Sequence, residues 1–254
     1  MRRYQAFSLL EIMMAIALGS FITLGLADIY FSHQRSYQNQ KALMQATQNG
    51  LLASNTIETL LSQDGYAGCL SLDNLQVTNH ISESQNDLAP TSLPGSSVWQ
   101  LKFMSPDIND VLQKMTSRNY ITVSESPKFD KGDIVMISDC HKADIFIIDD
   151  VYIKDDTQVL YTNSNLSIYK EGAIVGHWMQ PILYVTNTDR VDDLGRAIPA
   201  LYWHQLNGSD DELVEGVSQF KVIQKDNKIT VNLTSVSLDK IDAQTQQWQF
   251  NAYV

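Results

Sequence analysis

Hydrophobic and polar positions divide the chain into an apolar N-terminal run, a more polar helical stretch and a long remainder of short apolar segments. Within residues 7–27 the only ionisable side chain is Glu11. As a helix this run would rise about 31 Å, close to the thickness of bilayer hydrocarbon. Arg2 and Arg3 precede it and Asp28 follows it. The run is therefore predicted to span a membrane with the N-terminus in the cytoplasm.

The stretch after the apolar run keeps a helical period. Apolar and small residues recur at spacings of three and four, which indicates one helix face. These residues are Leu43, Ala46, Gly50, Ala53, Ile57 and Leu60. Asp64-Gly65 follows as a stop signal, and no proline occurs before residue 90. The sequence predicts one helix over residues 7–63, membrane-spanning over about 7–30, whose second half offers a narrow apolar stripe to a head.

The remainder, 64–254, predicts a β-rich head. Short segments rich in β-branched and aromatic residues are bounded by Gly, Asn, Asp or Ser. The candidate strands are 98–104, 120–124, 133–138, 144–153, 158–162, 182–187, 200–206, 213–224, 228–238 and 247–253. Their spacing leaves no room for helical crossovers, so antiparallel pairing is favoured. Residues 71–97 are predicted to be a loop. The expected fold class is α+β, a long N-terminal helix packed on an antiparallel β-rich globular head.

Two simple interpretations of the apolar run leave features unexplained. A secretory signal would end in small residues of an Ala-x-Ala type, whereas the chain continues as Asp28-Ile29-Tyr30-Phe31. A plain membrane anchor leaves Glu11 unexplained, because an unpaired carboxylate in an apolar helix costs on the order of a few kcal/mol.

A third interpretation accounts for both features. The segment Ala6-Phe7-Ser8-Leu9-Leu10-Glu11-Ile12-Met13-Met14-Ala15 resembles the class III signal of type IV prepilins and type II secretion pseudopilins. The resemblance implies that prepilin peptidase cuts between Ala6 and Phe7, that Phe7 is N-methylated, and that Glu11 becomes the fifth residue of the mature chain. Residues 1–6 would then be a leader peptide. The family normally has Gly before the cut, so Ala6 implies slower processing.

Glu11 has a physical role in that interpretation. Cleavage at Phe7 creates an ammonium group at the positive pole of a helix. In a stack of subunits, Glu11 of one chain can pair with the Phe7 ammonium of another, where leaving either charge alone would be costly. The pair would fix the axial register of assembly. The alternative is an interfacial Glu11 whose carboxylate reaches the lipid headgroups.

Composition and charge restrict the function further. Hydrophobic residues make up 44% of the 254 residues and charged residues 19%, which predicts a folded protein. Eighteen basic residues against 29 acidic residues give a formal charge of −11. Such a charge repels phosphate backbones, so nucleic-acid binding is not expected.

The two cysteines, Cys69 and Cys140, predict a disulfide. Beyond the membrane the compartment should be oxidising, where an even pair forms one bond. The surrounding sequence resembles the PilW-type minor pilins in three blocks. These are Gly65-Tyr66-Ala67-Gly68-Cys69, Gly132-Asp133-Ile134-Val135-Met136-Ile137-Ser138-Asp139-Cys140 and Glu212-Leu213-Val214-Glu215-Gly216-Val217.

Catalytic and metal-binding motifs are not found in the sequence. It lacks Gly-x-Ser-x-Gly, a phosphate loop, His-Glu-x-x-His and Cys-x-x-Cys, and its five histidines are scattered singly. No enzyme activity, cofactor or metal is therefore expected. Acid-rich turns at 189–193 and 210–212 offer oxygen atoms to calcium, but without a ligand-spaced loop they are interpreted as solvated surface.

The resemblance implies a minor pilin of a type IV pilus, in its initiating or tip complex. The head would be periplasmic and the anchor in the inner membrane, with the assembled subunit on the cell surface. Implied partners are prepilin peptidase, other major and minor pilins and a tip adhesin; implied processes are cell adhesion and twitching motility. Two alternatives stay open: a minor pseudopilin of type II secretion, and a membrane-anchored ligand-binding or adhesive module that does not polymerise.

Overall fold

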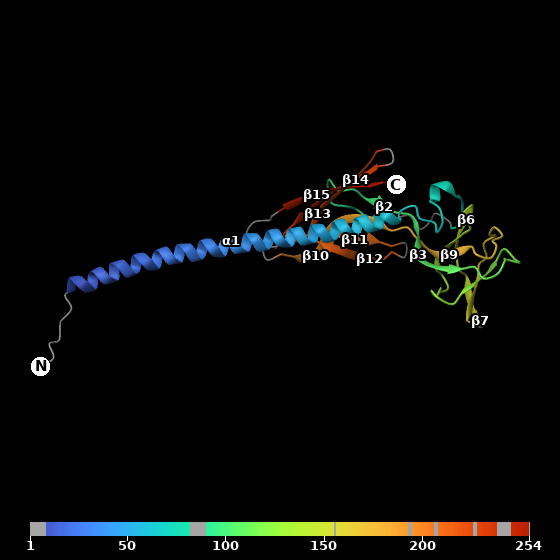
Figure 1. Cartoon of the computed structure of the whole chain (residues 1–254), viewed down its shortest axis with the longest axis horizontal. Coiled ribbons are helices and arrows are strands. Elements are labelled where there is room, and N and C mark those ends of the chain that lie inside the picture. The colour runs from blue at the N-terminus through green and yellow to red at the C-terminus, as the bar shows by residue number, and fades with distance from the viewer. Residues whose placement is uncertain are drawn as a thin grey trace.

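A single long helix carries the head at its C-terminal half (Figure 1). The computed structural model describes residues 9–81, 90–154, 156–192, 195–205, 208–225, 228–237 and 245–253. Helix α1 runs from Leu9 to Gln63, 55 residues, about 80 Å at 1.5 Å per residue. It ends where predicted, because Gly65 adopts a positive φ of 77° that turns the chain out of the helix. The predicted start at Phe7 lies outside the described residues.

The head is β-rich, as predicted. Its elements after α1 begin with a short 3-10 helix, Leu72–Asn74. The strands in the described residues are β1 (Gln76–Asn79), β2 (Trp99–Gln100), β3 (Phe103–Asp110), β4 (Tyr120–Ser124), β5 (Ile134–Ser138), β6 (Lys142–Ile147), β7 (Asp150–Lys154), β8 (Thr157–Tyr161), β9 (Ile174–Met179), β10 (Ile182–Val191), β11 (Ala197–His204), β12 (Asp210–Glu215), β13 (Val217–Lys225), β14 (Lys228–Val236) and β15 (Thr245–Tyr253).

These strands form two lobes. The proximal lobe consists of α1 from Ala42 onward with the sheets β12-β11-β10-β2 and β13-β14-β15. The distal lobe consists of the sheets β1-β6-β5-β9-β3 and β4-β8-β7, and it lies beyond the end of α1 (Figure 1). All pairs are antiparallel except β1 with β6, which is parallel. The antiparallel expectation was therefore wrong for that pair. The chain between the two strands contains no helix in its described residues, 80–81 and 90–141, so β6 returns beside β1 through strands and turns there.

The helix face that packs on the head consists of small residues up to Ala53 and of larger apolar residues after it. Its buried members are Ala42, Ala46, Gly50, Ala53, Ile57 and Leu61. The predicted stripe was wrong at Leu43, which is 43% exposed. Leu60 is partly buried and packs against the core as predicted, and Leu61 beside it is buried. Small side chains let the strands approach closely. Ser235 on β14 donates a hydrogen bond to the carbonyl of Ala46, 2.8 Å, and the Trp248 indole lies over Gly50.

Three predicted strands are broken in the structure. The segment 144–153 divides into β6 and β7, because the chain changes sheets at Ile148 and Asp149. The segment 213–224 divides at Gly216, whose φ is 74°, and 98–104 divides between β2 and β3. At the boundary between β6 and β7, the Ile148 amide donates to the carbonyl of Asp133, which precedes β5 of the five-stranded sheet. The next amide, of Asp149, donates to the carbonyl of Tyr161 on β8 of the other distal sheet. Continuous β propensity thus hides a change of sheet.

Two strands were missed. Strand β9 lies inside the five-stranded sheet, between β5 and the edge strand β3, although Gly176 interrupts its apolar pattern. A Cβ at Gly176 would lie 2.8 Å from Met104, so this glycine permits close packing of neighbouring strands. Strand β1 is polar and exposed, and it lies with the short 3-10 helix inside the predicted loop 71–97.

Candidate functional site

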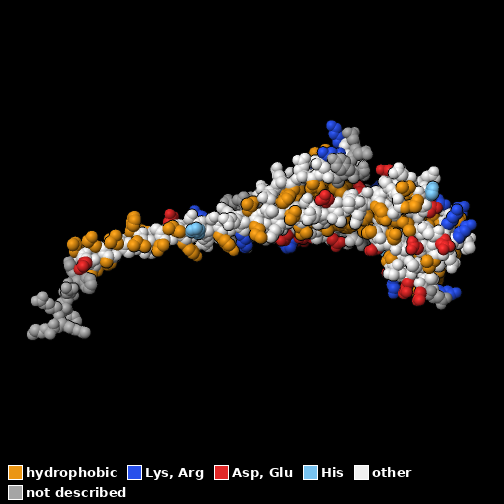
Figure 2. Space-filling view, viewed as in Figure 1, with side chains coloured by type: hydrophobic (Ala, Val, Ile, Leu, Met, Phe, Trp, Pro, Cys, Tyr) orange, Lys and Arg blue, Asp and Glu red, His pale blue; other side chains and the backbone are white. Residues whose placement is uncertain are grey.

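The first half of α1 stands away from the head with its apolar side chains exposed (Figure 2). In residues 9–41 only Ala27 and Gln38 are partly covered. The helix contains a window of mean hydropathy 2.0, none of it buried, which is long and apolar enough to cross a membrane. The large exposed side chains from Leu9 to Phe31 include Leu9, Leu10, Ile12, Met13, Met14, Ile16, Leu18, Phe21, Ile22, Leu24, Leu26, Ile29, Tyr30 and Phe31. A surface of this kind requires an apolar environment.

Glu11 lies in the first turn of this exposed segment. Its side chain borders a shallow hollow with Ile12, Ala15 and Ile16, so a carboxylate stands on an otherwise apolar surface. The next acid along the helix is Asp28, at the far end of the apolar run. Ala6 and Phe7, the predicted cleavage and methylation positions, lie outside the described residues.

The disulfide between Cys69 and Cys140 is confirmed. The two Cα atoms are 5.4 Å apart across a sequence separation of 71 residues. Cys69 follows the end of α1, and Cys140 sits in the turn between β5 and β6 with a φ of 67°. The Asp139 carboxylate accepts hydrogen bonds from the amides of His141 and Lys142 and so holds that turn. The bond ties the C-terminal end of α1 to the distal lobe.

The histidines are dispersed and several pair with aspartates. His80 lies 2.8 Å from Asp144, and His204 lies 2.7 Å from Asp210. A third pair, His177 with Asp133, is 3.1 Å long. The described residues contain no group of three or more His, Cys, Asp or Glu side chains arranged to hold a metal ion.

The acid-rich turns contain internal ion pairs. Asp192 binds the Arg196 guanidinium at 2.6 Å, and Glu212 binds Arg190. Asp210 accepts hydrogen bonds from Tyr184, at 2.9 Å, as well as pairing with His204. The carboxylates of Asp192, Asp210 and Glu212 therefore already have cationic, imidazole or hydroxyl partners.

A buried carboxylate in the distal lobe was not found from the sequence. Asp144 on β6 is 1% exposed and accepts hydrogen bonds from the Tyr169 hydroxyl, 2.8 Å, and the Ser167 amide, 3.0 Å, beside the His80 ring. Burial raises the pKa of Asp144, but the hydrogen bonds from His80, Tyr169 and Ser167 outweigh it and hold the pKa below its usual value. Burial and the adjacent carboxylate raise the pKa of Tyr169. No sequence signal marked Asp144, because its partners come from distant segments.

Comparison with known proteins identifies the N-terminal segment. Residues 1–27 match a family model described as the prokaryotic N-terminal methylation motif. No curated protein matches the chain. The matched segment begins before α1 and includes the first part of its exposed apolar half, up to residue 27. Residues 1–27 thus carry the class III signal of type IV pilin-like proteins, and α1 is long and apolar enough to anchor in a membrane.

Proposed function

We propose that the chain is a PilW-type minor pilin that assembles into the initiating or tip complex of a type IV pilus. Prepilin peptidase cuts between Ala6 and Phe7, and the new terminus is N-methylated. Before assembly the first half of α1 spans the inner membrane, with the N-terminus cytoplasmic and the head periplasmic. The observation that carries the proposal is the fully exposed apolar half of α1, with Glu11 in its first turn and the methylation motif over it.

The exposed surface of α1 extends further than a membrane requires. Beyond the apolar run, Tyr37, Met44, Leu51 and Leu52 are each at least half exposed on the side of the helix away from the head. These side chains continue the apolar surface along the side of α1 opposite the packed stripe. A second helix from a neighbouring subunit can cover them, since apolar residues at helical spacing form a packing surface. This supports assembly through α1 over simple anchoring.

Glu11 would set the position of that neighbour. In the mature chain the Phe7 ammonium lies at the positive pole of α1, and the Glu11 carboxylate of an adjacent subunit neutralises it. Both charges are then surrounded by apolar helices. Deleting one partner of such a buried pair costs about 3 to 5 kcal/mol, enough to decide whether a subunit is incorporated.

The three sequence blocks of the PilW resemblance occupy structural junctions. The first two place Cys69 and Cys140 at the disulfide. The third contains the last four residues of β12, then Gly216, then Val217 at the start of β13. A Cβ at Gly216 would lie 2.7 Å from Asn49 of α1 and 2.9 Å from the Val236 carbonyl. Each block thus contributes to how the head is held on the helix, which supports a common head design.

Cleavage is tested by N-terminal mass spectrometry of membrane-extracted protein from cells with active prepilin peptidase. The expected N-terminus is N-methylated Phe7. Retention of Met1 in such cells would refute processing. An Ala6→Gly variant is the matched comparison, and it should be processed faster than the natural chain, because Gly is the residue that the peptidase family normally cuts after.

Assembly is tested by comparing the amount of each variant in sheared pili with its amount in the inner membrane. Glu11→Ala and Glu11→Gln should both reach the membrane at the natural level but be lost from the pili. Asp28→Asn changes a charge on the same helix and should be incorporated normally. Natural incorporation of Glu11→Ala at an unchanged membrane level would remove the electrostatic role. Absence of the natural chain from pili, with a defect in type II secretion on its deletion, would assign it to the pseudopilins.

A further inference from the structure

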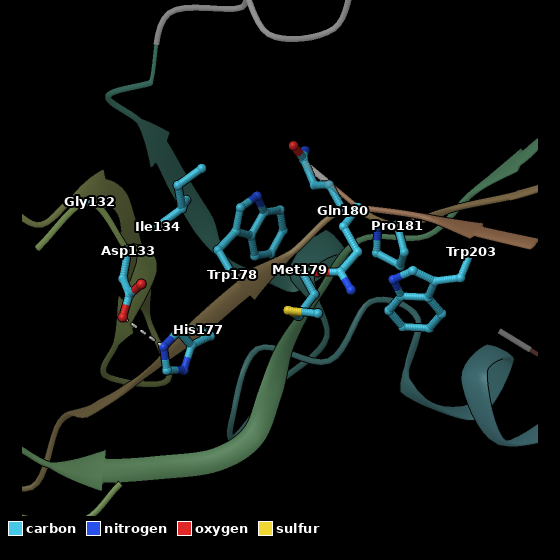
Figure 3. A pocket seen from close by; sticks show the side chains of 10 residues that line it. Gly132, Asp133, Ile134, His177, Trp178, Met179, Gln180, Pro181 and Trp203 are labelled. Carbon is cyan, nitrogen blue, oxygen red and sulfur yellow. Dashed lines mark hydrogen bonds and ion pairs between the residues drawn. The ribbon is translucent and has the colours of Figure 1, made fainter. Parts of the chain in front are cut away.

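A cavity of about 310 Å³ lies where the two lobes meet. We call it the junction cavity; it is lined by residues 132–134 and 177–181 with Trp203 and Gln205 (Figure 3). Strand β9 of the distal lobe continues past the end of β5 and passes through Gln180 and Pro181 directly into β10 of the proximal lobe. Small-molecule sites favour such junctions, and the volume is at the lower end of the roughly 300–1,000 Å³ typical of them.

The cavity combines flat apolar surfaces with groups that both donate and accept hydrogen bonds. Trp203 supplies a partly exposed indole ring from the proximal lobe, and Trp178 of the distal lobe, 5% exposed, borders the cavity as part of the core. Gln180 and Gln205 supply side-chain amides, each with a carbonyl acceptor and an NH₂ donor. Gln205 donates to the Asp211 carboxylate, which fixes its amide and leaves the carbonyl oxygen as an acceptor.

A carboxylate and an imidazole complete the polar side. His177 lies 3.1 Å from Asp133, and about a third of each side chain is exposed (Figure 3). The His177 ring packs against Phe129 at 4.9 Å between centroids, which holds the imidazole in place. The pair therefore presents a positioned acceptor and ring nitrogen at one end of the cavity, opposite the end formed by Trp203.

We propose that the junction cavity binds a neutral saccharide of one or two rings. A sugar ring has C–H groups on its face, which pack on aromatic rings, and hydroxyl groups at its edge, which both donate and accept hydrogen bonds. The Trp203 indole matches the face, and the amides with the Asp133–His177 pair match the edge. An aliphatic ligand would cover these polar groups without satisfying them, which costs free energy.

Charge favours a neutral ligand over an anionic one. None of the ten residues that line the cavity is Lys or Arg, and the acid Asp133 is among them. The whole chain has a formal charge of −11. Phosphorylated or carboxylated sugars would meet this field without a basic partner.

The test uses the full chain in micelles of a zwitterionic detergent, because detergents with sugar headgroups would compete for the site. Glucose, galactose, mannose and N-acetylglucosamine are offered at millimolar concentration, and binding is measured by saturation-transfer NMR and titration calorimetry. Binding of at least one of these sugars is expected. Glucuronic and galacturonic acids, which differ from glucose and galactose by a carboxylate, should bind more weakly than their neutral counterparts.

Two matched pairs of variants locate the binding. Gln180→Ala should weaken the affinity about tenfold, the effect of one lost hydrogen bond, whereas Gln224→Ala, in a different hollow of the proximal lobe, should not change it. Trp203→Leu should abolish binding, whereas Trp99→Leu should preserve it. Trp99 and Trp203 flank Leu183 in the same sheet and pack against the same core, so they control for folding.

The outcomes are decisive in both directions. Affinity about tenfold weaker in Gln180→Ala and loss of binding in Trp203→Leu, with binding kept in the two controls, support the site. Saturation transfer to none of the four neutral sugars would overturn the proposal. Equal binding by the natural chain and Trp203→Leu, or tighter binding of the acidic sugars, would also overturn it.

Discussion

The proximal lobe closes its core over α1, whereas the distal lobe closes its core between two sheets. Ala53, Ile57 and Leu61 of the helix belong to the same buried cluster as side chains from the sheets β12-β11-β10-β2 and β13-β14-β15. In the distal lobe the main cluster includes Ile121 and Phe146, and none of its described members comes from α1. The two lobes therefore depend on the helix to different degrees.

Because only the proximal core includes α1, the two lobes have different structural roles in the head. The proximal lobe has a core that is incomplete without the second half of α1, so its folding fixes the direction in which the exposed half projects. The distal lobe provides the partners of its own buried Asp144 carboxylate, and it is attached through the disulfide and the β2–β3 and β9–β10 connections. A distal lobe with its own core can change its surface without disturbing the assembly helix.

Among the changes that test how independent the lobes are, removing the disulfide should have the largest effect on stability. Replacing Cys69 and Cys140 by Ser opens a loop with a sequence separation of 71 residues, and chain entropy alone predicts a loss of about 4 kcal/mol. The loss should fall mainly on the distal lobe, which contains most of that loop. Hydrogen exchange measured by mass spectrometry should show reduced protection of β5 and β6 while β13 and β14 stay protected. An equal loss in both lobes would show that they unfold as one unit.

Adding a methyl group at Gly50 should affect the proximal lobe alone. A Cβ there would lie 2.0 Å from the Trp248 indole nitrogen and 2.8 Å from the Ser235 hydroxyl, so Gly50→Ala overpacks the contact between α1 and the sheet. The expected destabilisation is about 1–3 kcal/mol. Hydrogen exchange should increase in β14 and β15 without change in the distal strands.

Gly25 provides the control for Gly50. It lies in the exposed half of α1, and a Cβ there would meet nothing within 4 Å. Gly25→Ala should leave head stability unchanged, because it improves only helix propensity. If Gly50→Ala behaved like Gly25→Ala, the close packing of α1 on Trp248 would be contradicted.

The same contrast explains which parts of the fold could be predicted from the sequence. The helix end at Gln63 and the strand β4 depend on local signals, a Gly turn and a run of β-branched residues, and both were predicted at the correct residues. The boundary between β6 and β7 depends on which sheet each half joins. That choice is made by tertiary contacts, such as the Asp149 amide with the Tyr161 carbonyl, which local propensity does not contain.

The functional residues divide in the same way. Glu11 and the apolar run could be identified because a membrane segment has a strong local composition, and the cysteine pair because there were only two. The Asp144 network and the junction cavity could not be identified. Their residues come from strands far apart in sequence, and Trp178 and Trp203 individually match ordinary core positions. The cleavage and methylation at Ala6 and Phe7 remain predictions.

Lowering the pH should destabilise the distal lobe through Asp144 and should remove an energetic cost at Asp64, at the end of α1. The pKa of Asp144 is lower in the folded protein than its ordinary value of 3.8, so its ionised form stabilises the distal lobe above that pH. This contribution is lost as the pH falls through the folded-state pKa. Burial raises the pKa of Asp64, at the end of α1, so protonation there relieves a cost as the pH falls.

Denaturation followed separately in each lobe, at pH values above and below 3.8, measures this difference. Asp144→Asn should weaken the distal lobe at neutral pH and flatten its loss of stability in acid. Asp64→Asn should leave the distal profile unchanged. A distal lobe whose stability in Asp144→Asn still falls as steeply in acid would show that another carboxylate carries the effect.

The smallest effect is expected at the surface of the proximal lobe. Arg190 on β10 binds Glu212 and lies 3.4 Å from Glu215, both on β12, but its side chain is 51% exposed. Exposed ion pairs contribute little, because water and salt screen them. Arg190→Ala should therefore lower stability less than Gly50→Ala does. The loss caused by Arg190→Ala should vanish in high salt.

Arg190→Lys sharpens this last test, because it keeps the positive charge but loses the guanidinium that reaches both glutamates. If the attraction is mainly a screened charge effect, Arg190→Lys should resemble the natural chain at low salt and Arg190→Ala should not. If instead the fork geometry holds β10 to β12, both variants should show increased hydrogen exchange in β12 at every salt concentration. The distal strands should be unaffected in either case, because Arg190 and its partners lie wholly in the proximal sheet.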